Sequence, residues 1–248
     1  MSEPVNYEAM FSGVIGTEYQ WLKKICPLAA HMSRLVGDAV ASYCKANPGR
    51  VQVLELGGGT GVTTVAILSA SEHLSVRSVD NEPTMQAQAK NNLLFFQEQG
   101  RLTFIENDAL AALKVLPTGS LDIVASAYTV HNFLASYRQQ VLAEIFRVLK
   151  PGGHFINGDR YALDDVAAHT LMVQQELVGY FKVFVAEKRL DLLEQWVIHL
   201  FADEAENRIM RESVALRQLA EAGFVAIELS QRAEVNALVT AVKPSADS

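Results

Sequence analysis

A run of glycines directly after a short apolar segment constrains the fold of this chain most strongly. Residues 51–56 have the apolar pattern of a buried β-strand, and Gly57-Gly58-Gly59-Thr60-Gly61 follows them at once. A helical pattern begins after the loop, at residue 63. Glycines at such a strand-to-helix turn let the backbone turn tightly and let a ligand approach without meeting Cβ atoms. The sequence therefore predicts a ligand-binding loop here, with a simple tight turn as the alternative.

Strand and helix patterns alternate through the middle of the chain. Further strands are predicted at residues 74–80, 102–105 and 121–126 and from 154 onward, with helices at 63–69, 83–96 and 137–149. This alternation predicts right-handed βαβ units and a parallel sheet, which is an α/β fold. Ligands of such sheets bind outside the carboxyl ends of the strands, near the point where strand order reverses.

Two regions outside the alternation have helical patterns. One apolar face within residues 7–47 consists of Leu28, Met32, Leu35, Val36, Ala39, Val40 and Tyr43. A second stripe, within residues 163–222, consists of Val166, Thr170, Leu171, Leu177, Val178 and Phe181. Two last strands are predicted at 223–229 and 235–242. We expect one domain with four parts: an N-terminal helical region (1–49), a ligand-binding core (50–160), a helical insert or cap (161–222) and the last two strands (223–243).

Composition excludes several function classes. The net charge is −7 and no basic run exceeds Lys23-Lys24, which disfavours direct nucleic-acid binding. No apolar run approaches the roughly 20 residues of a membrane span, and residues 1–4 lack the pattern of a signal peptide, so we expect a cytoplasmic protein. Cys26, Cys44 and the six histidines show no metal-ligand spacing, so no metal site is predicted.

A carboxylate ends the second predicted strand. Asp80 can accept both hydrogen bonds of a ribose diol, and Asn81 could assist; the alternative role is a helix N-cap before Pro83. The glycines fall at alternate positions, with Glu55 two residues before the first. This spacing departs from the dinucleotide fingerprint, in which one residue separates the first two glycines and the third comes three positions later.

Polar residues also follow the third and fourth predicted strands. The third strand leads into Asn107-Asp108-Ala109, where Asp108 could contact a ligand or cap a helix. The fourth leads into Ser126-Ala127-Tyr128 and then His131. A histidine there could act as a general base, because its pKa is near neutrality, or could merely line the pocket.

Together with the segment 147–153, Arg-Val-Leu-Lys-Pro-Gly-Gly, these motifs resemble those of class I S-adenosylmethionine-dependent methyltransferases over roughly residues 50–160. The resemblance implies a seven-stranded Rossmann-like sheet with an antiparallel last strand, and S-adenosylmethionine as the cofactor. It also implies that Asp108 meets the adenine amino group and that Ala109 supplies a backbone N–H. The cofactor-binding residues expected from it are Glu55, Gly57, Gly58, Gly59, Gly61, Asp80, Asn81, Asp108, Ala109, Ser126 and Ala127.

A narrower resemblance extends over most of the chain. The segment 79–85, the helical insert after Asp159 and Glu187-Lys188-Arg189 are similar to carboxy-S-adenosylmethionine synthases. This resemblance implies that Arg189 holds an additional carboxylate of the cofactor. The sequence departs from that family at Ala29, where the family has a tyrosine that contacts the cofactor, and at Ala127, where it has an asparagine.

We therefore expect a methyltransferase that acts on a small molecule. His131 and Tyr128 are the expected catalytic residues, and the expected acceptor-binding residues are Asp159, Arg160, Tyr161 and Arg189. The helical insert is expected to close the site or to form a homodimer contact. Two alternatives remain: synthesis of a carboxylated cofactor, and a protein that binds S-adenosylmethionine without turnover.

Overall fold

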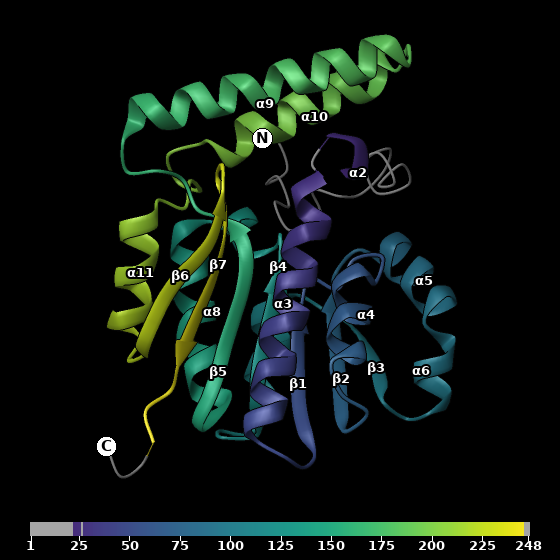
Figure 1. The fold of residues 1–248 in the computed structure, drawn as a ribbon, viewed down its shortest axis with the longest axis vertical. Helices are drawn as coiled ribbons and strands as arrows, with labels where there is room; N and C mark the ends of the chain where they lie inside the picture. Colours follow the sequence, from purple (N-terminus) through teal and green to yellow (C-terminus); the bar gives the residue numbers. More distant parts are fainter. Residues whose placement is uncertain (1–21, 26, 246–248) are drawn as a thin grey trace, which may run out of the picture.

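The computed structural model describes residues 22–25 and 27–245, which form a seven-stranded sheet flanked by helices (Figure 1). The sheet has the order β3-β2-β1-β4-β5-β7-β6. Its strands are β1 (Val51–Leu56), β2 (Leu74–Asp80), β3 (Leu102–Glu106), β4 (Leu121–Ala127), β5 (Leu149–Arg160), β6 (Val225–Ala233) and β7 (Asn236–Val242). Strands β1 to β5 pair in parallel, whereas β7 is antiparallel to both of its neighbours. The α/β class, the seven strands and the antiparallel last strand are thereby confirmed.

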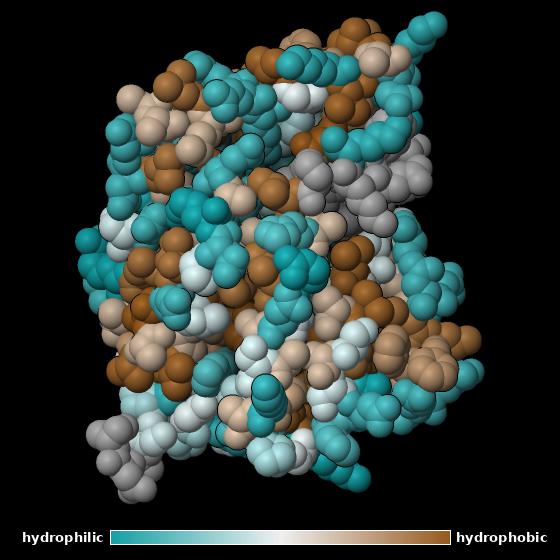
Figure 2. Space-filling model, in the orientation of Figure 1, coloured by the Kyte–Doolittle hydropathy of each residue, from teal (hydrophilic) through white to brown (hydrophobic). Residues whose placement is uncertain are grey.

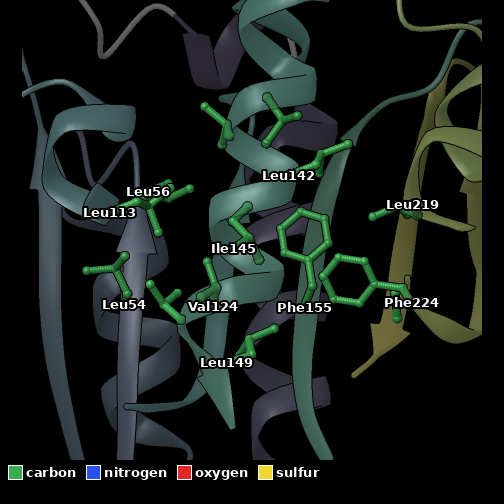
Figure 3. Close-up of a cluster of buried hydrophobic side chains, with 14 of the residues drawn as sticks. Leu54, Leu56, Leu113, Val124, Leu142, Ile145, Leu149, Phe155, Leu219 and Phe224 are labelled. Atoms are coloured by element: carbon green, nitrogen blue, oxygen red, sulfur yellow. The ribbon is translucent and has the colours of Figure 1, made fainter. Parts of the chain in front are cut away.

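Helices cover both faces of the sheet. Buried residues of α3 (Pro27–Ala46) and α4 (Val62–Ser69) pack on one face, where Met32, Val36 and Val40 of the expected stripe are fully buried. On the other face lie α7 (Ala109–Lys114), α8 (Ala135–Val148) and α11 (Glu212–Glu221). Figure 3 shows Phe155 of β5 beside Phe224, with Ile145 of α8 pointing toward them. Residues 7–21 of the expected N-terminal helical region, and Cys26, lie outside the described residues.

Two expected boundaries are wrong. The helix expected at 83–96 is divided into α5 (Pro83–Asn92) and α6 (Leu94–Glu98), because Leu93 is buried with the non-helical angles φ −115° and ψ 21°. Residues 151–153 lie inside β5 instead of before it. They form an irregularity in the pairing with β4, whose register jumps from Leu121–Leu149 to Ile123–His154.

A hairpin of α9 (Val166–Ala186) and α10 (Leu190–Asp203) lies across one end of the sheet (Figure 1). Arg160, at the carboxyl end of β5, ties it there through Glu176 at 2.9 Å and Glu204 at 3.3 Å. The hairpin has its own small core, which includes Tyr180, Phe184 and Trp196. None of the helices in the described residues combines the length and the apolarity that a bilayer-spanning segment needs.

The apolar stripe predicted within 163–222 lies on helix α9 and is largely exposed. Four of its residues are about half exposed or more: Val166 (59%), Leu171 (59%), Val178 (50%) and Phe181 (49%). Helix α9 carries apolar residues on most of its circumference, so its sequence period does not select the side that is buried. Tyr180 and Phe184 occupy that side instead.

Strand β6 forms one edge of the sheet and is irregular. Its pairing with β7 changes register between Val225 and Glu228 and again between Ser230 and Ala233. Ala226 and Gln231, at these two breaks, have positive φ angles of 47° and 52°. The edge strand is therefore kinked twice.

Candidate functional site

The glycine loop is fastened to the end of the neighbouring strand. The N–H groups of Gly57 and Gly58 donate to the carbonyl oxygen of Val79, at 2.8 and 3.0 Å. Gly57 has φ +71°, and a Cβ atom there would lie 1.9 Å from Oγ1 of Thr129. A side chain at position 57 is therefore excluded both by the backbone conformation and by the loop that follows β4.

A cavity of about 250 Å³ opens beside this loop. It lies at the point where strand order reverses, because Gly57 follows β1 and Tyr128 follows the adjacent β4. Among the expected site residues, Gly57, Gly58, Gly59, Ala127 and Tyr128 line it. Thr60 of the predicted loop and Ala29 also line it, and the lining residues that sequence reasoning missed are Ala30, Ser33, Val62, Thr63, Gln88 and Asn92. The missed residues come from α3, α4 and α5, and in the sequence they are small or ordinary helix residues without a motif.

Asp80 holds the glycine loop and the start of α5 together. Its Oδ2 accepts from the N–H of Gly59 at 2.7 Å, and its Oδ1 accepts from the N–H of Glu82 at 2.8 Å. The N-cap of α5 is Glu82, whose carboxylate accepts from the N–H of Thr84, so the alternative role of Asp80 as the cap is wrong. Burial raises the pKa of Asp80, although its backbone hydrogen bonds oppose this. Each carboxylate oxygen still has a lone pair for a further donor.

Glu55 lies beneath the loop and does not reach the cavity. Its side chain is fully buried and its Oε2 accepts from the hydroxyl of Thr64 at 2.6 Å. A Cβ atom at Gly58 would lie 3.3 Å from the same carboxylate oxygen. Burial raises the pKa of Glu55 to about 7. The structure thus places Glu55 as a buried support of the loop, and Glu55 is not among the described residues that line the cavity.

Asp108 caps α7. Its Oδ1 accepts from the N–H of Ala111 at 2.8 Å and from the hydroxyl of Tyr137 at 2.9 Å. Both hydrogen bonds go to Oδ1, and within the described part of the chain Oδ2 accepts no hydrogen bond. Asp108 can therefore cap the helix and still accept a hydrogen bond from a ligand. Ala109 and Asn81 are half-buried, whereas Ser126 is fully buried.

Tyr128 forms the wall of the cavity at the end of β4. It has φ +53°, which is unusual for a residue with a side chain. Its hydroxyl donates to Oδ1 of Asn236 on β7, and its carbonyl oxygen accepts from the amide of Asn132 at 3.3 Å. The strained backbone is thus held from two sides, which is common at functional sites.

His131 lies behind the Tyr128 ring, on the side away from the cavity. Its ring is edge-on to Tyr128, with the centroids 5.9 Å apart, and it is not among the described residues that line the large cavity. Its Nδ1–H donates to Oδ1 of Asp159 at 2.5 Å. Oδ2 of Asp159 accepts from the backbone N–H groups of Val130 and His131, at 2.9 and 3.2 Å. Burial alone would raise the pKa of Asp159, but the His131 ring, the backbone N–H of Arg160 and the side-chain amide of Asn157 hold that pKa below its usual value.

A second polar group from α10 faces His131. Nε2 of His131 lies 3.7 Å from Oδ2 of Asp203, and Nε2 of His199 lies 3.6 Å from the same oxygen. All three residues are buried. A small cavity of about 10 Å³ adjoins them, and Arg160, His169 and Glu204 help to line it. Sequence reasoning missed His199 and Asp203, although their i, i+4 spacing on a helix could have indicated a pair on one face.

The remaining expected acceptor residues are dispersed. Arg160 lines the small cavity and pairs with Glu176 and Glu204. Tyr161 is buried in the core and accepts from the amide of Asn157 at 2.8 Å, and burial raises its pKa. Arg189 lies directly before α10 and pairs with Asp191 at 2.8 Å. The structure therefore brings Arg160 close to His131 and Asp159, and it links Tyr161 to Asp159 through the shared amide of Asn157. Of the expected acceptor residues, Arg189 lies apart from this group.

The chain is similar in sequence to known methyltransferases. Residues 53–153 match the family described as Methyltransferase domain. The chain is 25% identical to carboxy-S-adenosyl-L-methionine synthase of Erwinia tasmaniensis over 180 residues, which are 70% of each chain. It is 24% identical to the same enzyme of Campylobacter lari over 188 residues, 74% of this chain and 76% of that one.

Solved structures share the fold at lower identity. An O-methyltransferase family protein from Burkholderia thailandensis has a TM-score of 0.64 and 17% identity, covering 88% of this chain and 57% of its own. The CurJ carbon methyltransferase has a TM-score of 0.65 and 18% identity, covering 94% and 60%. The chain thus spans about three fifths of the length of these two solved chains. The resemblance to class I methyltransferases and their carboxy-S-adenosylmethionine synthase-like branch is confirmed.

Proposed function

We propose that this chain, a class I S-adenosylmethionine-dependent methyltransferase, acts on a small-molecule acceptor. The observation that carries the proposal is the cavity between the glycine loop and Tyr128, at the reversal point of the sheet. The bound cofactor supplies an electrophilic methyl group on a sulfonium. The residues of the chain then have to bind, orient and shield the two reactants, which can provide much of the rate enhancement.

The site fits the adenosyl group of this cofactor. The loop at Gly57 and Gly58 leaves no room for side chains, and Asp80 retains lone pairs for two ribose hydroxyls. We assign Asp80 and Asn81 to the ribose and Asp108 with Ala109 to the adenine. Gly59, Gly61, Ser126 and Ala127 would border the methionine end.

The acceptor would lie on the side of Tyr128. Its ring separates the large cavity from His131, which Asp159 holds in one orientation. We assign Tyr128 to shape the acceptor pocket and His131 to act on the acceptor from the small cavity, with Arg160 beside it. Tyr161 and Arg189 would contribute only if the acceptor extends beyond these groups.

Binding and turnover can be tested separately. We expect calorimetry to detect S-adenosylhomocysteine binding to the purified chain. Ala30→Trp, which fills the cavity, should abolish that binding, whereas Ser42→Trp on the exposed side of the same helix should not. Incubation with deuteromethyl-labelled S-adenosylmethionine and a panel of small hydroxyl, amine and enol acceptors should give a labelled product by mass spectrometry. No binding by the unmodified chain, or equal binding by Ala30→Trp, would contradict the proposal.

Synthesis of a carboxylated cofactor is the second candidate. It is favoured by the similarity to enzymes of that name over about 70% of the chain. Against it, Ala29 and Ala127, the two departures from that family, both line the cavity. Mass spectrometry of the ligand that copurifies distinguishes the two candidates. A carboxylated species that disappears in Arg189→Ala but persists in Arg217→Ala would replace methyl transfer by this second function.

We also propose a cytoplasmic homodimer that associates through the helical insert. Large apolar side chains on α9 and α10 are exposed, and Figure 2 shows brown side chains at the end of the molecule where these helices lie. Phe181 is 49% exposed and Phe201 is 66% exposed. Light scattering should report a dimer that the double change Phe181→Ser and Phe201→Ser converts to a monomer. A monomer before the change would refute the assignment.

A further inference from the structure

We propose that His131, His199 and Asp203 form a binding site for one divalent transition-metal ion. The group joins the loop after β4 to α10, so residues 68 or more positions apart in the chain meet in the fold. One nitrogen of each imidazole and one oxygen of the carboxylate lie within 4.8 Å of one another, and all three side chains are buried. Two imidazoles and one carboxylate suit zinc, iron or cobalt better than magnesium or calcium.

The distances within the group are those of ligands around a small ion. Oδ2 of Asp203 lies 3.7 Å from Nε2 of His131 and 3.6 Å from Nε2 of His199. Both separations are too long for hydrogen bonds. Ligands about 2.0–2.1 Å from a tetrahedral metal are about 3.3–3.4 Å apart, so a contraction of a few tenths of an ångström would bring each pair into place.

Asp203 provides an independent indication of a ligand. Its carboxylate is 7% exposed, and its Oδ1 has no hydrogen-bond partner among the described residues. A buried carboxylate without donors is costly, because it loses its hydration without compensation. Asp203 faces two imidazole nitrogens across a gap too wide for a hydrogen bond, and a cation in that gap would satisfy it.

His131 is already oriented as a metal-ligating histidine. Its Nδ1–H donates to Asp159 at 2.5 Å, which fixes the tautomer and leaves the Nε2 lone pair directed at Asp203. A carboxylate behind the histidine is the usual partner of a metal ligand and raises its basicity. Asp159 is itself held by backbone N–H groups, so this orientation is rigid.

The charge balance and the space also fit a cation with an open coordination position. Among the residues that the structure describes, the carboxylates around the group outnumber the guanidinium groups: Asp159, Glu176, Asp203 and Glu204 against Arg138, Arg160 and Arg208. The cavity of about 10 Å³ is bordered by His131 and Asp203 and is large enough for one water. Three protein ligands and one exchangeable ligand are the arrangement of catalytic metal sites.

The site would give His131 a definite role beside the proposed methyl-acceptor pocket. With its Nε2 on a metal it would not take a proton itself, and the ion would instead bind and polarise an oxygen of the acceptor. This consequence rests on the proposed function, whereas the metal site does not. Metal binding is measured without cofactor or acceptor, so its failure would leave methyl transfer unaffected.

The test uses the full chain without an affinity tag, stripped of metal by dipicolinate. We expect Co²⁺ to bind with one-to-one stoichiometry and micromolar or tighter affinity, to give visible d–d absorption, and to be displaced by Zn²⁺ but not by millimolar Mg²⁺. Asp203→Asn and His199→Gln should abolish the absorption. Asp159→Asn should weaken binding by about 10- to 100-fold, because it removes the partner of a ligand. His154→Gln, a half-buried histidine elsewhere on the sheet, should bind like the unmodified chain.

Two results would overturn the proposal. One is the absence of stoichiometric Co²⁺ or Zn²⁺ binding by the unmodified chain; the other is unchanged binding in folded Asp203→Asn and His199→Gln. Should these variants not fold, anomalous diffraction at the zinc edge from crystals of the unmodified chain decides the question. A peak about 2.0–2.1 Å from Nε2 of His131 supports the site, and no peak there refutes it.

Discussion

The burial of the Glu55 carboxyl group under the glycine loop leads to a prediction of how the free energy of unfolding depends on pH. Glu55 is fully buried, and burial raises its pKa from 4.5 to about 7. Between these pH values the folded chain keeps a proton that the unfolded chain has released, so the free energy of unfolding falls as pH rises. The difference between the two pKa values corresponds to a total change of about 3 kcal/mol in the free energy of unfolding. Of this change, about 2–3 kcal/mol occurs between pH 5 and pH 8.

Glu55→Gln removes this titration while keeping the shape of the side chain and an acceptor for the Thr64 hydroxyl. We expect the free energy of unfolding of the variant, minus that of the unmodified chain, to increase by about 2–3 kcal/mol from pH 5 to pH 8. Urea unfolding followed by circular dichroism at both pH values measures it, since subtraction cancels the other titrating groups. Glu72→Gln, at an exposed position, should show no such change. A difference that is independent of pH would refute the reasoning that Glu55 is protonated in the folded chain near neutrality.

Three further changes test other parts of the structure. Asp80→Ala should weaken S-adenosylhomocysteine binding by about 10- to 100-fold, or ~1–3 kcal/mol, by calorimetry; unchanged affinity would limit Asp80 to holding the loop. Gly57→Ala should destabilise the fold by at least about 1 kcal/mol and so lower the melting temperature, because the alanine Cβ would collide with Thr129 and the backbone has a positive φ. An unchanged melting temperature would contradict the described loop. Phe224→Ala should cost about 3–5 kcal/mol in urea unfolding, since its ring is buried against two others; a cost below 1 kcal/mol would argue against that packing.

The sheet could be predicted from the sequence because its signals are local. A buried parallel strand reads as a short apolar run, and each predicted strand from β1 to β5 overlaps an observed one. The glycine loop is similarly local, since the positive φ of Gly57 and the space around it both require the residue type. Helix α9 is the counterexample, because its apolar residues surround the helix and only the tertiary contacts select Tyr180 and Phe184 for burial.

The site was harder to predict because its chemistry depends on residues that are distant in the chain. Asp80 was found through its place at a strand end, but its bonds to Gly59 and Glu82 need the folded loop. The grouping of His131 with His199 and Asp203 depends on how α10 docks on the sheet, which no local pattern encodes. A search for ligand spacing along the sequence therefore does not find a group of residues that only the tertiary structure brings together.

The two kinks in β6 have a consequence for how copies of this chain meet one another. An open sheet ends in a row of unpaired N–H and C=O groups, onto which a strand of another molecule can add. In β6 the register breaks near Ala226 and Gln231 interrupt that row, and charged residues such as Glu228 and Arg232 lie along it. The outer strand therefore offers only short stretches of regular edge, too short to template a growing intermolecular sheet. Local irregularity that weakens pairing within the fold protects the chain against strand-by-strand aggregation.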